Sequence, residues 1–270
     1  MNYSFAFMKN NLVVLFSILT LFVARCTPKD EFESKGFAVA KSRENDENDG
    51  SNGLKKDSLL FKTQPSNVIL TGDPNIRLAS IFKVNVRTKD SSTFIGSNLF
   101  HYSYEGDDSK RGNVWNDHLI PGFEALYGFN LVNIAHYNIK DNKQGLFFDN
   151  PVLIKTLYFP TNERDTLQGV RVNRNYFLVS AYNEDSNKDG FINLKDLRRF
   201  YLFNLNGEKQ ATLIPENYST FKSEYDDAND YLYVFAQLDK NSNGQQDSGE
   251  PVHVFWIDLK DPSRTGALYQ

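Results

Sequence analysis

The chain has 270 residues, a formal net charge of −4 and a single cysteine, Cys26. A modest acidic balance argues against a nucleic-acid partner, which requires a basic face. One cysteine excludes an intramolecular disulfide, and with no second cysteine in the chain cysteine-ligated zinc and thiol catalysis by any other residue are excluded too.

Residues 1–25 predict an export signal that is removed. Met8 and Lys9 give it a positive start, and residues 12–23 form an unbroken stretch of apolar, Ser and Thr residues. This stretch of about a dozen residues is too short to cross a bilayer core, which needs about 20. Removal of the signal leaves 28 basic and 34 acidic residues, a net charge of −6.

Cys26 directly follows this segment. A lone cysteine at that place resembles the lipidation site of bacterial lipoproteins, with Arg25 standing where a small residue is usual. The following residues 27–31 (TPKDE) resemble the surface-export signal of Bacteroidota lipoproteins. The resemblance implies an outer-membrane lipoprotein held by lipid chains without a spanning helix, exposed at the surface, with a periplasmic or secreted protein as the alternative. A plain secretory signal with an incidental cysteine is the simpler interpretation.

The rest of the chain divides by composition. Residues 26–65 are rich in charge, Asn, Ser and Gly, which predicts a flexible tether after the lipidated cysteine. Residues 66–270 contain short runs of Val, Ile, Leu, Phe and Tyr separated by Gly, Asn, Asp and Pro. This pattern is typical of one all-β domain.

An internal repeat lies in the second half of the domain. Residues 177–182 (FLVSAY) lead into a polar loop and residues 200–205 (FYLFNL) lead out; 54 residues later, 231–236 (YLYVFA) and 254–259 (VFWIDL) do the same. The shift places Gly190 on Gly244 and predicts one shared register for the two hairpins. A fainter copy enters at 131–136, has Gly145 in its loop and leaves at 152–159.

With the strands between the hairpins, the unit has four antiparallel strands in about 50 residues. It resembles a blade of a TolB-like β-propeller over residues 120–270. The expected fold is therefore all-β, built from four-stranded antiparallel repeats as a propeller or partial propeller. A β-sandwich of hairpins is the alternative.

The polar loop 185–196 (DSNKDGFINLKD) resembles an EF-hand calcium loop position by position. A hard cation takes six to eight oxygens, and alternating short side chains on a curled loop converge on one point, with glycine at the sixth place for the bend. Asp196 replaces the usual Glu at the twelfth position. The expected ligands are Asp185, Asn187, Asp189, the carbonyl of Phe191, Asn193 and Asp196.

The loop 239–250 (DKNSNGQQDSGE) repeats the pattern, with Gly244 in the sixth place. The expected ligands are Asp239, Asn241, Asn243, the carbonyl of Gln245, Asp247 and Glu250. Loops rich in Asp, Asn and Gly are also good turns. Two full matches at the same place in a repeat favour Ca²⁺, and strands on either side favour a structural clamp over a helix-opening sensor. The third copy lacks the ligands.

Four common enzyme motifs, HExxH, GxSxG, the P-loop and GxGxxG, do not occur in the sequence. His136 and His253 fit ordinary strand positions. Trp115, Asp117 and His118 are the best candidates for any functional cluster, and Glu105, Asp107 and Asp108 are the acids that a glycosidase would need. The predicted function is a calcium-binding lipoprotein that acts as a binding or interaction module for a protein or glycan. The alternative is a propeller-type hydrolase or glycan-binding protein with exposed Tyr102, Tyr104, Trp115 or Phe123.

Overall fold

The computed structural model describes residues 31–38, 61–86, 90–95, 98–100, 120–128 and 130–269. The chain divides into two compact units, 1–31 and 32–270, and all the described strands belong to the second. The export signal, Cys26 and much of the expected tether lie outside the described residues. No helix in the described ranges is long and apolar enough to cross a membrane. One short helix, α2 (Glu31–Lys35), accompanies the strands, so the all-β prediction is confirmed.

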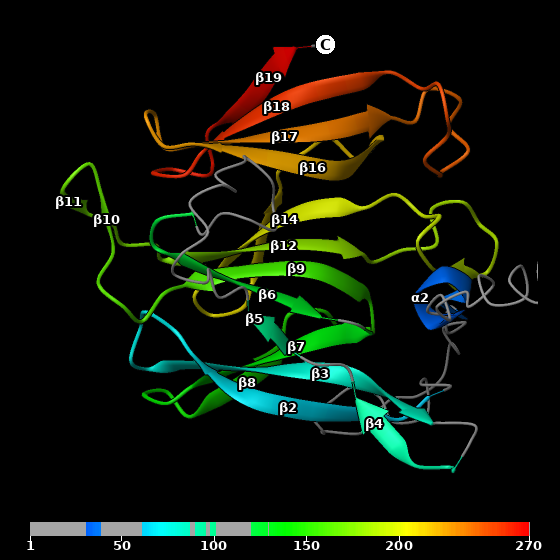
Figure 1. Ribbon diagram of the computed structural model, residues 1–270, viewed down its shortest axis with the longest axis horizontal. Helices are drawn as coiled ribbons and strands as arrows, with labels where there is room; N and C mark the ends of the chain where they lie inside the picture. Colours follow the sequence, from blue (N-terminus) through cyan, green and yellow to red (C-terminus); the bar gives the residue numbers. More distant parts are fainter. Residues whose placement is uncertain are drawn as a thin grey trace, which may run out of the picture. The chain divides into compact units, whose positions relative to one another are not determined.

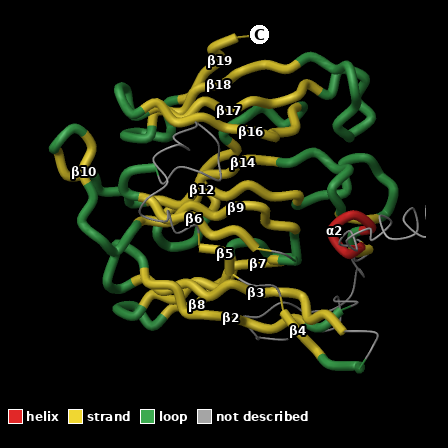
Figure 2. Tube along the Cα trace, in the orientation of Figure 1, coloured by secondary structure: helices red, strands yellow, loops and turns green. Residues whose placement is uncertain are grey.

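Three antiparallel sheets make up most of the described chain (Figures 1 and 2). The first sheet has the order β2-β3-β7-β8, with β4 paired to β3. Its strands are β2 (Thr63–Leu70), β3 (Ile76–Val86), β4 (Thr93–Ile95), β7 (Leu131–Asn138) and β8 (Lys143–Leu146).

The central sheet has six strands in the order β15-β14-β12-β9-β6-β5. They are β5 (Asn98–Phe100), β6 (Phe123–Gly128), β9 (Leu153–Pro160), β12 (Tyr176–Tyr182), β14 (Arg199–Asn204) and β15 (Lys209–Thr212).

The third sheet is a meander, β16-β17-β18-β19. Its strands are β16 (Tyr218–Asp226), β17 (Tyr231–Leu238), β18 (Val252–Asp258) and β19 (Thr265–Tyr269), and two small pairs complete the fold: β1 (Phe37–Ala38) with β13 (Phe191–Ile192), and β10 (Thr166–Leu167) with β11 (Val170–Arg171).

The inner strands β9, β12 and β14 of the central sheet are buried on both faces, and this explains their continuous apolar runs. All seven residues of β12 are buried, and successive side chains of a strand point to opposite faces. Phe177 and Val179 therefore enter a core shared with the first sheet, whereas Tyr176 and Leu178 enter a core shared with the third. Burying each such large side chain stabilises the fold by roughly 1.5–3 kcal/mol.

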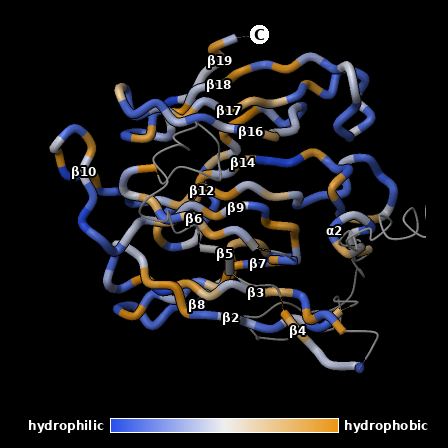
Figure 3. The backbone as a smooth tube through the Cα atoms, viewed as in Figure 1, coloured by the Kyte–Doolittle hydropathy of each residue, from blue (hydrophilic) through white to orange (hydrophobic). Residues whose placement is uncertain are grey.

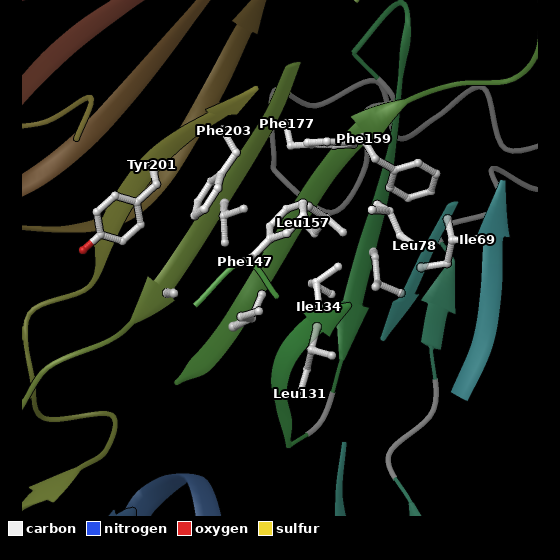
Figure 4. Packing of buried hydrophobic residues seen from close by; sticks show 14 of the residues in the cluster. Ile69, Leu78, Leu131, Ile134, Phe147, Leu157, Phe159, Phe177, Tyr201 and Phe203 are labelled. Atoms are coloured by element: carbon white, nitrogen blue, oxygen red, sulfur yellow. The ribbon is translucent and has the colours of Figure 1, made fainter. Parts of the chain in front are cut away.

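Figure 4 shows the core between the first and central sheets, and Figure 3 shows hydrophobic residues along the strands of the central sheet. The labelled members of this core are Ile69, Leu78, Leu131, Ile134, Phe147, Leu157, Phe159, Phe177, Tyr201 and Phe203. Phe147 stacks on Phe203 with ring centroids 4.8 Å apart. Adjacent blades of a propeller and the sheets of a sandwich both pack face to face in this way. The described strands do not close into a barrel.

Both predicted hairpins are present: β12–β14 lies in the six-stranded central sheet and β17–β18 in the four-stranded third sheet. Their pairing differs by one residue. Leu178 pairs with Leu202, so a shift of 54 would pair Leu232 with Trp256, yet Leu232 pairs with Ile257. The shared register of the sequence is therefore not kept in the ladder.

The prediction of a third long-loop hairpin, from residues 131–136 to 152–159, is wrong. Residues 143–146 form β8, which turns back on β7 and places Gly145 opposite His136. The expected outgoing strand, β9, instead joins the central sheet between β12 and β6. A tight turn with Asn142 in the left-handed region (φ 51°) closes the β7–β8 hairpin, so no long loop exists there.

Candidate calcium sites

Both predicted calcium loops connect the paired strands of a hairpin. The 185–196 loop joins β12 to β14, and the 239–250 loop joins β17 to β18. Figure 1 shows the two connections at the same end of their sheets. Hydrogen-bonded strands thus fix the two ends of each loop.

The two loops have the same backbone conformation at two diagnostic places. The fourth residues, Lys188 and Ser242, both have positive φ, at 61° and 57°. The sixth residues, Gly190 and Gly244, have φ of 90° and 73°. A side chain is strained at positive φ, so glycine at the sixth place permits the bend that curls each loop.

The first residue of each loop holds this bend through its carboxylate. Asp185 accepts the N–H groups of Asp189 and Gly190 at 2.9 and 2.8 Å. In the second loop, Asp239 accepts those of the fifth and sixth residues at 3.0 and 2.9 Å. The matched pattern follows from the matched spacing of the two loops.

The twelfth residue closes each loop onto its second and ninth residues. Asp196 accepts the N–H groups of Ser186 at 2.9 Å and of Asn193 at 2.8 Å, one on each oxygen. Glu250 accepts that of Lys240 at 2.9 Å and that of the ninth residue at 3.3 Å, again on separate oxygens. The shorter arm of Asp196 therefore makes the same closure as the glutamate.

The third, fifth and ninth side chains converge within each loop. The amide nitrogens of Asn187 and Asn193 lie 3.5 and 3.3 Å from one oxygen of Asp189. In the second loop, the third and fifth residues are asparagines whose amides both donate to Asp247, at 3.0 and 2.5 Å. Three of the expected side-chain ligands therefore meet at one place in both loops.

The donor chemistry fits a hard cation. Across the described ranges, no three His, Cys, Asp or Glu side chains are grouped so as to hold a metal by themselves. Asparagine and main-chain oxygens must therefore complete each set of ligands. The carbonyl expected from Gln245 lies in a residue that also forms a β-bridge with Asp196. Oxygen donors of this mixed kind suit Ca²⁺.

Asp196 is the most enclosed of the expected ligands. It is fully buried, and burial raises its pKa, although N–H donors from Asn193, Asn187 and Ser186 act in the opposite direction. Asn193 is 2% exposed and Asp239 is 8% exposed. A buried carboxylate is stabilised by a nearby positive charge, so the first loop would gain from a cation.

The loops also contact each other. The Ser186 hydroxyl donates to the carbonyl oxygen of Gly244 at 2.5 Å. A Cβ added at Gly244 would lie 1.9 Å from the carbonyl oxygen of Ser186, so the main chains touch there. With the Asp196–Gln245 bridge, these contacts join the two loops into one structure.

The other candidate residues do not form a described site. Phe123 is 2% exposed and belongs to the core, so it cannot serve a sugar platform. His136 is buried and its Nε2 lies 2.6 Å from the Leu205 oxygen, and His253 Nδ1 contacts the Tyr218 hydroxyl at 2.7 Å. The remaining candidates lie outside the described residues: Tyr102, Tyr104, Glu105, Asp107, Asp108, Trp115, Asp117 and His118.

Sequence reasoning missed a buried ion pair. Arg174 binds Asp230 through two hydrogen bonds of 2.9 and 2.6 Å, and it also donates to the carbonyl oxygens of Pro121 and Leu259. Both partners are buried. Fifty-six residues separate the two in sequence, so no local pattern could have indicated their pairing.

A polar cleft of about 450 Å³ lies beside this pair. It is lined by main-chain turns around Gly72, Gly122 and 160–164, and by residues 171–174. Arg174 contributes to its lining and is bound by Asp230, and the other charged lining residues are Asp73, Glu163, Arg164 and Arg171.

The chain matches no protein-family model and no curated protein sequence.

Proposed function

We propose that this protein is a calcium-binding, lipid-anchored β protein of the bacterial cell envelope, which acts as a binding or interaction module. The observation that supports the calcium proposal best is the matched folding of the two loops. In each loop, main-chain N–H groups donate to the carboxylates of the first and twelfth residues in the same way, and the third, fifth and ninth side chains converge.

Bound calcium would supply a positive counter-charge next to the loop carboxylates. The first loop would hold it with its Asp and Asn side chains and the carbonyl of Phe191, and the second with its equivalents and Glu250. Main-chain N–H groups already orient Asp185, Asp196, Asp239 and Glu250, so little reorganisation of these four carboxylates is required. Preorganisation of this kind lowers the cost of binding.

The flanking strands support a structural rather than a signalling role for the metal. β12 is buried along its whole length, and all residues of β14 but the last are buried too. A packed sheet of this kind does not open as a pair of helices can. Calcium would therefore clamp the long connections of a rigid scaffold, with affinity of order 10⁻⁴–10⁻³ M as in extracellular modules.

The anchor is proposed from sequence. Cys26 after a short apolar segment supports lipidation, and residues 27–31 support export to the surface of an outer membrane. The ligand of the module is proposed only as a protein or glycan.

Thermal unfolding with and without calcium tests the metal proposal. Saturating two sites at about ten times their dissociation constants adds about 3 kcal/mol, which corresponds to a rise in Tm of roughly 6–12 °C for a domain of this size. Asp185→Ala and Asp239→Ala should each remove part of the rise, and the double variant should remove all of it. Asp227→Ala, an exposed aspartate in the β16–β17 turn, is the matched control and should keep the full rise. An equal rise in the double variant would place calcium elsewhere.

A further inference from the structure

The segment 32–38, within the range expected as a flexible tether, packs against the first calcium loop. β1 (Phe37–Ala38) pairs antiparallel with β13 (Phe191–Ile192), the seventh and eighth residues of that loop. Two positions further along the loop, Leu194 donates its N–H to the carbonyl oxygen of Glu33 at 3.1 Å. The loop therefore presents an extended edge to which the N-terminal segment adds.

The main-chain groups of residues 191–194 point alternately into the loop and toward the N-terminal segment. The N–H groups of Phe191 and Asn193 point into the loop, to Asp189 at 2.9 Å and Asp196 at 2.8 Å. The main-chain groups of the intervening Ile192 and of Leu194 point the other way, because successive residues of a strand face opposite sides. The same four residues are thus held on one edge by expected calcium ligands and on the other by the segment.

The segment also has its own anchors on the β domain. Glu33 is 6% exposed, and it accepts the N–H of Asn130 at 3.1 Å and pairs with Lys155 at 2.5 Å. Phe37 packs with Phe61 at a ring-centroid distance of 5.2 Å. These contacts bring a part of the chain close to Cys26 in sequence into register with the metal loop.

We propose that calcium in the 185–196 loop favours docking of segment 32–38, so that the metal sets how much free chain lies between the lipid anchor and the domain. This rests on the calcium binding proposed above. Calcium holds the inward edge of residues 191–194 in the conformation whose outward edge binds the segment. Coupling between two sites is reciprocal, so docking of the segment in turn strengthens calcium binding in that loop.

The consequence for a lipid-anchored protein is a change of reach. Phe32 lies six positions after Cys26, and the chain between these two residues spans at most about 22 Å. With the segment released, this limit no longer applies, because the contacts of Glu33 and Phe37 that tie residues 32–38 to the domain are lost. Calcium would thus hold the module close to the membrane, and its loss would let the module move away.

Hydrogen–deuterium exchange of the full chain measures docking directly. The peptide covering 32–38 should exchange at least about tenfold more slowly in millimolar calcium than in chelator. Gly36→Ala should abolish this protection, because Gly36 has φ 76° and a Cβ there would lie 2.1 Å from the main-chain oxygen of Ile192. Gly169→Ala is the matched control: its φ is 77°, but nothing lies within 4 Å of the added Cβ.

Calorimetry of the same variants tests reciprocity. Gly36→Ala should weaken one calcium site by about 5- to 100-fold and leave the other unchanged, whereas Gly169→Ala should change neither. Two intact sites with the same exchange of 32–38 in calcium and chelator, or two unchanged affinities in Gly36→Ala, would overturn the coupling and leave the calcium proposal standing. Absence of calcium binding in the wild-type chain would overturn both.

Discussion

The Ser186 hydroxyl of the 185–196 loop donates to the Gly244 carbonyl oxygen of the 239–250 loop at 2.5 Å. The two residues are 58 positions apart in sequence, yet the loops they belong to share a β-bridge and a main-chain contact. A change at this contact should therefore reach both proposed metal sites.

The paired glycines of the two loops give a direct comparison. Gly244→Ala adds a Cβ 1.9 Å from the Ser186 oxygen at φ 73°, whereas Gly190→Ala adds one in open space at φ 90°. Gly190→Ala should lower the free energy of unfolding by about 1–2 kcal/mol and weaken one site. Gly244→Ala should cost more and weaken both. Chemical denaturation and calcium titration measure these effects, and equal losses in the two variants would contradict contact between the loops.

The buried Arg174–Asp230 pair should be a main determinant of stability. Asp230→Asn leaves a buried guanidinium without its counter-charge, which costs about 3–5 kcal/mol. Arg264→Gln is the comparison, because Arg264 is 62% exposed in its ion pair with Asp258 and should cost at most about 1 kcal/mol. Urea unfolding at pH 7 gives both values. A loss under 1 kcal/mol for Asp230→Asn would show that the pair does not hold the third sheet's turn in place.

Acid should destabilise the fold partly through His136. Burial lowers its pKa below 6.5, although its hydrogen bond to Leu205 acts in the opposite direction. Protons therefore bind the unfolded chain more readily, so the stability that neutral His136 contributes is complete above about pH 6.5 and falls as the pH drops through its folded pKa. His136→Gln should remove this part of the decline between pH 7 and 5. Parallel stability curves for the two proteins would contradict the assignment.

Lipidation at Cys26 is tested by metabolic labelling. A palmitate analogue should label the wild-type protein in the membrane fraction, and Cys26→Ser should lose both the label and the membrane association. Each acyl CH₂ buried in a bilayer contributes about 0.8 kcal/mol, so loss of the chains is sufficient to release the protein. Unchanged labelling of the variant would exclude this cysteine as the anchor.

The parts of the fold that local sequence determines were predictable. Apolar runs and turn residues identified β12, β14, β17 and β18. The first two strands are buried on both faces, which favours a continuous apolar run, whereas β17 largely alternates between buried and half-buried residues. The positions of Gly190 and Gly244 identified the sharp bends of both loops. Apolar periodicity and turn-forming residues act over a few positions, so both can be recognised in the sequence alone.

The remainder depended on long-range pairing. Nothing local indicates that β9 leaves β7 for the central sheet, or that Leu232 pairs one residue further along than the repeat implies. The same holds for Glu33. The composition of the surrounding segment predicts a tether, but the Glu33 carboxylate accepts the N–H of Asn130 and pairs with Lys155. In each case the partner lies far away in sequence, and tertiary packing determines which residues pair.

Calcium titration of the purified full chain by calorimetry tests the central claim most directly. Two sites should appear at sub-millimolar to millimolar calcium, and the double variant Asp185→Ala with Asp239→Ala should bind none. No heat of binding from the wild-type chain at several millimolar calcium would contradict the account.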